Sequence, residues 1–240
     1  MFLLMGPITN ILLLYVLAAV LPAIFLMLYV YNQSRMHRQP TGLLVRLVWD
    51  GVLAALAATV LELIGESLLN SSSLANSPNY LAFLAFLIVG VVEEGTKFFF
   101  MRKDTWHNPY FETRFDGIVY CVFASLGFAA FENIKYVFSY GLGVAPSRAL
   151  LAIPGHMSFA VLMGYFYGRA KLKEDCGHHG EAVLMQAIGY LAAVGLHGAY
   201  DYCAMLGSDT STIVFFIIII VIYLIVFRLV KHEAANDRIV

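Results

Sequence analysis

Two adjacent carboxylates and an ammonium group lie inside an apolar stretch of the sequence. Glu93, Glu94 and Lys97 belong to a run of mostly apolar residues that begins near Tyr80. Placing a charge near the centre of a bilayer costs at least about 2.5 kcal/mol on insertion scales, so such residues usually serve a function. Glu93 and Lys97 are one helical turn apart and can pair. Glu94 is rotated by about 100° around the helix, so we expect it to gain nothing from Lys97 and to find its partners on other helices.

Three later apolar stretches supply polar side chains that these carboxylates could meet. The first contains Glu132 followed by Asn133, the second contains His156, and the third contains His197 with Asp201 four residues further on. A carboxylate four residues from a histidine can accept its spare ring N–H and fix its tautomer. A single buried histidine is more often a satisfied core residue than a ligand, but two histidines and three glutamates within the membrane favour a reactive site.

These residue types are those of a hydrolytic metal centre. Two imidazoles and one carboxylate form the ligand set of one class of catalytic zinc site, in which water takes the open position. We therefore predict that Glu132, His156 and His197 hold zinc (Zn2+). Glu93 or Glu94 would then act as the general base that activates water and later passes the proton to the leaving amine.

Two other interpretations of the same residues stay open. In a reaction without metal, Glu93 or Glu94 would act on water directly and His197 would stabilise the oxyanion. In a purely structural interpretation, Lys135 would neutralise Glu132 from three residues further along the helix.

The composition is that of a membrane protein. Of the 240 residues, 60% are hydrophobic and only 13% are charged, and the mean hydropathy is +0.77. A soluble domain of this size would expose one continuous apolar surface, so we predict an all-α polytopic membrane protein in contact with the lipid bilayer. The net charge of −1 and the absence of a basic stripe do not indicate nucleic-acid binding. The three cysteines are too widely spaced for a disulfide framework or a CxxC zinc site.

Seven apolar windows are long enough to cross a bilayer. They lie at about 6–31, 43–64, 80–101, 115–139, 148–169, 183–206 and 211–231. We divide them into two N-terminal transmembrane helices (1–79), a four-helix catalytic core (80–206), and a C-terminal transmembrane helix with a cytoplasmic tail (207–240). At a rise of 1.5 Å per residue, Glu132, His156 and His197 each lie about 18–21 Å from one edge of the apolar layer, and Glu93 lies about 12–13 Å from it. Four of the spans can therefore deliver their polar groups to one depth.

The basic residues predict an orientation. They fall in alternate connections, at Arg35, Arg38, Arg102, Lys103, Arg114, Arg169, Lys171, Lys173, Arg228, Lys231 and Arg238. The positive-inside rule then predicts a multi-pass protein of the cell membrane with its N-terminus outside and its C-terminus in the cytoplasm. Glu62, at the outer end of the second span, is expected to be solvated.

The ordered set of polar residues resembles the PrsW family of bacterial intramembrane proteases, relatives of the CAAX-processing and Abi-type membrane proteases. The matching motifs are Glu93-Glu94-x-x-Lys97, Asp116-Gly117-Ile118-Val119-Tyr120, Phe128-x-x-x-Glu132-Asn133, His156 and His197-x-x-x-Asp201. The resemblance covers about residues 80–205 and implies cleavage of a membrane-protein substrate, such as an anti-sigma factor, near the bilayer. It also implies orienting roles for Lys97, Asn133 and Asp201. The CAAX-processing relatives have a histidine where this chain has Glu132, which leaves both metal-dependent and glutamate-based chemistry open.

Two functions of other classes compete with the protease. Buried carboxylates and histidines also form the relay of proton- or cation-coupled carriers, and a polar layer can serve a non-catalytic scaffold as a helix-packing device. Many carriers are built from duplicated halves, and the order of polar residues in this chain shows no internal repeat. Seven spans, no repeat and a set of histidines and glutamates suited to metal therefore favour the protease over the carrier.

Overall fold

The computed structural model describes residues 6–34, 36 and 38–240, and Arg35 lies outside them. The described chain is helical apart from short connections and one isolated bridge between Thr113 and Ile239. Its elements are α1 (Pro7–Gln33), α2 (Thr41–Asn70), α3 (Tyr80–Ala82), the π-helical segment η2 (Phe83–Gly90), α4 (Val91–Thr105), α5 (Arg114–Tyr140), the 3-10 turn η3 (Leu142–Val144), α6 (Ala145–Ser147), the π-helical segment η4 (Arg148–Ala152), α7 (Ile153–Asp175), α8 (His179–Leu206) and α9 (Asp209–Ala235).

The helices confirm the predicted all-α polytopic membrane fold. By length and composition, 6 helical segments of the described chain can cross a membrane. The seventh predicted span is also helical, from Tyr80 to Thr105 through α3, η2 and α4. Every 18-residue stretch of that segment includes Glu93, Glu94 and Lys97, so its charge sets it apart from the other six.

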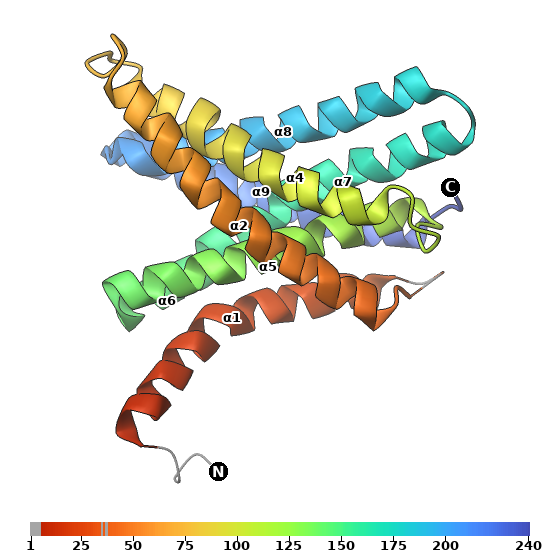
Figure 1. Cartoon of the computed structure of the whole chain (residues 1–240), viewed down its shortest axis with the longest axis horizontal. Helices are drawn as coiled ribbons and strands as arrows, with labels where there is room; N and C mark the ends of the chain where they lie inside the picture. The colour runs from red at the N-terminus through yellow and green to blue at the C-terminus, as the bar shows by residue number, and fades with distance from the viewer. Residues whose placement is uncertain (1–5, 35, 37) are drawn as a thin grey trace.

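The long helices run back and forth between two ends of the molecule (Figure 1). The connections α1–α2, α4–α5 and α7–α8 and the C-terminus lie at the right-hand end, and the connections α2–α3 and α8–α9 lie at the other. The basic residues of alternate connections therefore lie at the end of the molecule that carries the C-terminus. This two-ended distribution is the one that the sequence predicts.

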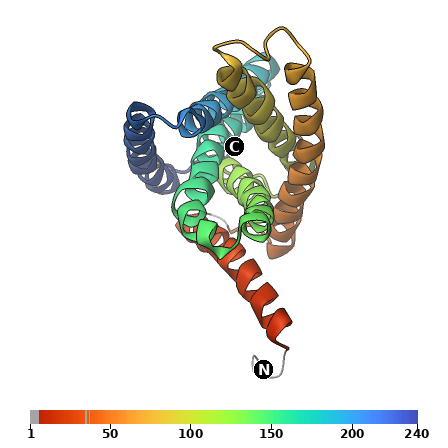
Figure 2. The ribbon, with the colours of Figure 1, turned by 90° about the vertical axis from the view of Figure 1, so that its left-hand side faces the viewer.

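Helix α5 forms the centre of the bundle. Every residue from 115 to 130 is buried, and α1, α2 and α7 pack around this helix. Viewed from one end (Figure 2), α9 lies at the edge, and α1 leans away from the other helices toward its N-terminus. The surface of α9 is mostly exposed, which is expected for a helix that faces lipid.

Glycines allow the helices around α5 to approach closely. A Cβ on Gly51 of α2 would lie only 2.6 Å from the Phe128 nitrogen, and closer still to the Ala124 carbonyl oxygen. On the other side, a Cβ on Gly117 of α5 would lie 2.8 Å from the Gly164 carbonyl oxygen of α7. Small residues at such crossings are typical of membrane helix packing, which relies on van der Waals contact. These contacts hold α7 and its histidine at a fixed distance from α5.

Candidate active site

The three charged residues of α4 form a buried ion-pair cluster. Glu93, Glu94 and Lys97 expose only 5%, 1% and 3% of their surface. The Lys97 Nζ lies 3.0 Å from Glu93 Oε2, as expected, and 2.8 Å from Glu94 Oε1. The expectation that Glu94 gains nothing from Lys97 is therefore wrong. Residues three and four apart are both neighbours on a helix, and the long lysine side chain reaches between the two carboxylates.

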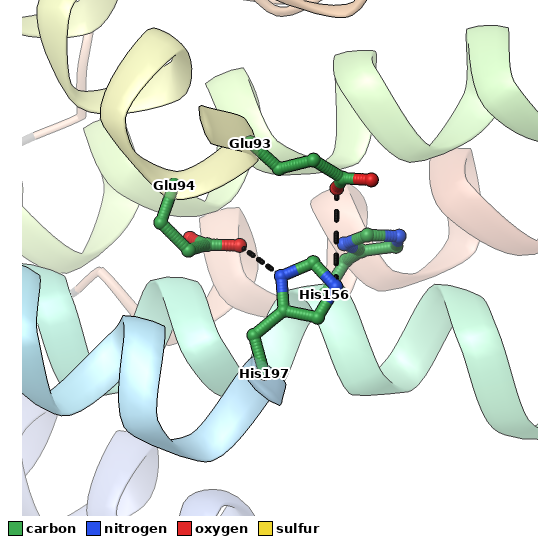
Figure 3. Close-up of side chains that lie close together, drawn as sticks. All are labelled: Glu93, Glu94, His156 and His197. Atoms are coloured by element: carbon green, nitrogen blue, oxygen red, sulfur yellow. Dashed lines mark hydrogen bonds and ion pairs between the residues drawn. The ribbon is translucent and has the colours of Figure 1, made fainter. Parts of the chain in front are cut away.

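His197 of α8 faces both glutamates (Figure 3). Its Nδ1 lies 2.8 Å from Glu94 Oε1, and its Nε2 lies 3.9 Å from Glu93 Oε2. The Asp201 carboxylate is 3.4 Å from the same Nε2. Asp201 thus lies near His197, as the spacing of four residues predicts, but the shorter contact of the ring is with Glu94. Glu94 is therefore the group that fixes the orientation of this imidazole.

His156 of α7 lies between Lys97 and Glu132. Its Nδ1 is 3.2 Å from Lys97 Nζ, and its Nε2 is 3.1 Å from Glu132 Oε2. An ammonium group can only donate hydrogen bonds, so Nδ1 accepts and Nε2 carries the proton that is donated to Glu132. The π-helical segment η4 ends at Ala152, two residues before Pro154, in agreement with the helix-loosening effect of a proline.

Glu132 is neutralised by an arginine that the sequence reasoning did not connect to it. Arg148 of η4 donates from Nη2 to Glu132 Oε2 at 2.7 Å and from Nε to Asn133 Oδ1 at 2.8 Å. Asn133 also donates to the Ala19 carbonyl oxygen of α1 at 2.8 Å, so it orients Arg148 rather than touching the histidines. A sequence signal existed, because Arg148 is a lone basic residue at the start of a predicted span, where the adjacent connection has no other.

Lys135 does not neutralise Glu132 in the structure. Its Nζ donates to Thr59 Oγ1 of α2 at 2.9 Å. The structural interpretation of Glu132 as the partner of Lys135 is therefore wrong, since Lys135 turns toward α2 while Glu132 turns toward α7.

Four of the predicted residues form a group that could hold a metal ion. One ligand atom from each of Glu93, Glu94, His156 and His197 lies within 4.8 Å of the others. Two imidazoles and two carboxylates at this spacing suit a transition metal such as zinc. Glu132 is not a member of this group. Its carboxylate instead contacts Arg148 and His156, so the two histidines are grouped with Glu93 and Glu94 and not with the carboxylate of the predicted ligand set.

A cavity of about 600 Å³ gives access to the site. It is lined by Glu93, Glu132, His156, His197 and Asp201, with aromatic residues of α8 and α9 on its outer side. Glu94 does not line this cavity but borders a void of about 10 Å³ on the inner side of the cluster. The two adjacent carboxylates therefore differ in access, because Glu93 faces the space that a substrate could enter and Glu94 faces the interior.

Glu62 of α2 lies in the wall of the same cavity. Its side chain is half-buried, and within the described structure its Oε1 has no hydrogen-bond partner. The expectation that Glu62 is simply solvated is wrong, because its Oε1 is buried in the wall of this cavity.

Comparisons with known proteins identify a family for this chain. A family model described as PrsW family intramembrane metalloprotease matches residues 39–229. Curated relatives named Protease PrsW include that of Clostridioides difficile, 29% identical over 86% of this chain and 86% of the relative. Those of Halalkalibacterium halodurans and Bacillus subtilis are 31% and 28% identical, each over 92% of this chain, and over 97% and 94% of the relative. No solved structure shows a significant match.

The family model spans the buried charge cluster, both histidines and the cavity that exposes them. The relatives align over nearly their whole length with this chain. The chain thus belongs to the PrsW family and is an intramembrane protease.

Proposed function

We propose that this protein hydrolyses a peptide bond of a membrane-protein substrate in the 600 Å³ cavity, with Glu93 as the general base. The observation that carries the proposal is the difference in access between the two adjacent glutamates. Glu93 lines the cavity beside His156 and His197, whereas Glu94 is turned inward. A general base must come within hydrogen-bond reach of the water that it activates. Water in the cavity can meet this condition at Glu93.

The other buried groups hold the reacting ones in place. Glu94 fixes His197 through its contact with Nδ1. Lys97 balances part of the charge of the two carboxylates, which lowers the cost of keeping them within the membrane. Glu132, held by Arg148, accepts the Nε2 proton of His156 and so presents Nδ1 of that ring to the site. In a reaction without metal, His197 faces the cavity and can stabilise the negative charge that develops on the scissile carbonyl oxygen.

The residues present fit a catalytic zinc ion. We propose His156, His197 and Glu94 as the groups that would hold it, which leaves Glu93 free in the cavity wall as the base. Within the described structure, Glu94 Oε2 is buried without a hydrogen-bond partner, so a cation would satisfy it. When bound, zinc would polarise the scissile carbonyl and make water more acidic.

One observation favours a second mechanism that uses no metal. The Lys97 Nζ lies within 3.2 Å of Glu93, Glu94 and His156, so a positively charged ammonium group already contacts all three acceptors. In this version, Glu93 activates water directly and Lys97 balances part of the charge of both carboxylates. Glu93 remains the base in either mechanism, and the metal content of active protein separates the two.

We propose that the substrate is a membrane protein such as an anti-sigma factor, as the family resemblance implies. A cavity that opens through mostly apolar and aromatic walls suits a substrate segment that arrives through the bilayer. Purified protein reconstituted in liposomes should cut a co-reconstituted single-span anti-sigma factor, and mass spectrometry of the products locates the cut. Failure to cut any of several such single-span proteins would contradict the proposed substrate class.

We also propose that the protein resides in the cell membrane with the basic end of the bundle in the cytoplasm. The N-terminus then lies outside and the C-terminus inside. A reporter fused in the 70–79 connection should show that this connection lies outside the cytoplasm. A reporter fused in the 170–182 connection should show that this one lies in the cytoplasm. The reverse pattern, or both reporters on one side, would contradict this orientation.

A further inference from the structure

A second cavity lies between α4 and α8, away from the catalytic one. It has a volume of about 320 Å³. Its walls come from Gly95 and Phe98 of α4 and from Val183, Ala187 and Tyr190 of α8. Val183 exposes 65% of its surface at the rim, so this α4–α8 groove opens toward the lipid rather than toward the interior.

One end of the α4–α8 groove carries a positive charge whose partners are neutral. Arg102 donates from Nε to the Gln186 side-chain oxygen at 2.6 Å, and its guanidinium lies 5.1 Å from the centre of the Trp106 ring. No carboxylate of the described residues lies within ion-pair distance of Arg102. The rest of the guanidinium therefore remains available to an anion at the mouth of the groove.

The charge and position of the groove suit the headgroup and the upper part of one acyl chain of a phospholipid. From Arg102 to Gly95 the wall extends for seven residues, or about 10 Å along the helix. Arg102 lies near the end of the bundle that carries the basic connections, and Trp106 beside it is a residue type that is frequent at membrane interfaces. The charge is thus placed at headgroup depth, and the apolar wall runs from there toward the middle of the membrane.

We propose that the α4–α8 groove binds one anionic phospholipid, with its phosphate at Arg102 and an acyl chain along Phe98 and Ala187. Arginine is well suited to phosphate because its guanidinium can donate two parallel hydrogen bonds. The opposite wall is tied to the catalytic helix, since the Tyr190 hydroxyl donates to the Val91 carbonyl oxygen at 3.0 Å. The bound lipid therefore packs against the turn of α4 that carries the catalytic glutamates.

Native mass spectrometry of the delipidated full-length protein tests this site with two probes, phosphatidylglycerol and phosphatidylcholine. We expect one phosphatidylglycerol per chain to bind at least about fivefold more tightly than phosphatidylcholine, the factor typical of one basic side chain at a membrane surface. Arg102→Gln should remove this preference. Ala187→Phe, which fills the groove, should weaken the binding of both lipids.

The matched control is Lys103→Gln, which removes the same charge from the next, exposed position of α4. It should keep the preference for phosphatidylglycerol. Equal affinity of the wild type for the two lipids, or an equal loss in Arg102→Gln and Lys103→Gln, would overturn the site. A groove covered by a second copy of the chain, seen as a dimer that takes up no lipid, would overturn it as well. The readout is binding, so it does not depend on peptidase activity.

Discussion

Replacing Glu93 with glutamine should reduce the rate of substrate cleavage by about 10²–10⁴-fold, the usual contribution of a general base. Glutamine has nearly the same shape and can still accept a hydrogen bond from Lys97, but it cannot take a proton from water. Glu93 also lines the catalytic cavity beside both histidines, so its loss acts on the reaction itself. Initial rates of cleavage of a reconstituted single-span substrate, compared with those of the wild type, measure the effect.

Glu62→Gln is the matched control for Glu93→Gln. Glu62 lines the same cavity, is a glutamate in a membrane helix, and is half-buried, but no histidine lies within ion-pair distance of it in the described structure. The Glu62→Gln variant should cleave the substrate at a rate close to that of the wild type. The thermal unfolding midpoint of each variant shows whether it is folded. A folded Glu93→Gln variant that cleaves at a normal rate would remove Glu93 from the reaction.

The helical segments and the meeting of their polar groups could be predicted from the sequence because of two strong physical constraints. A membrane span needs about 20 mostly apolar residues, which makes the length of each helix visible in the sequence. Charges in the membrane are costly and need partners, so the sequence predicts that Glu93, Glu132, His156 and His197 can meet at one depth. In the structure, ligand atoms of Glu93, His156 and His197 lie within 4.8 Å of one another together with one of Glu94, and the Glu132 carboxylate contacts His156.

The partners of individual side chains could not be predicted in the same way. Arg148 is the first residue of the π-helical segment η4, and from there it contacts Glu132 while also donating a hydrogen bond to Asn133. The pairing of Lys97 with both glutamates depends on the rotamer of one long side chain. The spacing of residues along a helix is compatible with several partners for one side chain, and tertiary packing determines which of these contacts forms. Glu93 lines the cavity and Glu94 does not. This difference is likewise set by the rotation of α4 against α8.

The metal content of purified protein should distinguish the ligand set suggested by the structure from the one predicted by sequence. In the metal-dependent mechanism, active wild type holds about one zinc ion per chain. Glu94→Gln should then lose both zinc and activity, whereas Glu93→Gln should keep zinc and lose activity, because a base is not a ligand. Elemental analysis of each folded variant beside its cleavage rate gives the comparison.

Glu132→Gln decides between the two ligand sets. If Glu132 only positions His156, glutamine can still accept the Nε2 proton through its side-chain oxygen, so zinc stays bound and cleavage falls less than in Glu93→Gln. If Glu132, His156 and His197 are the ligands, the same variant loses zinc. Fully active wild type with far less than about one transition-metal ion per chain would contradict both sets. That result would assign the reaction to Glu93, with Lys97 as the cation that contacts Glu93, Glu94 and His156.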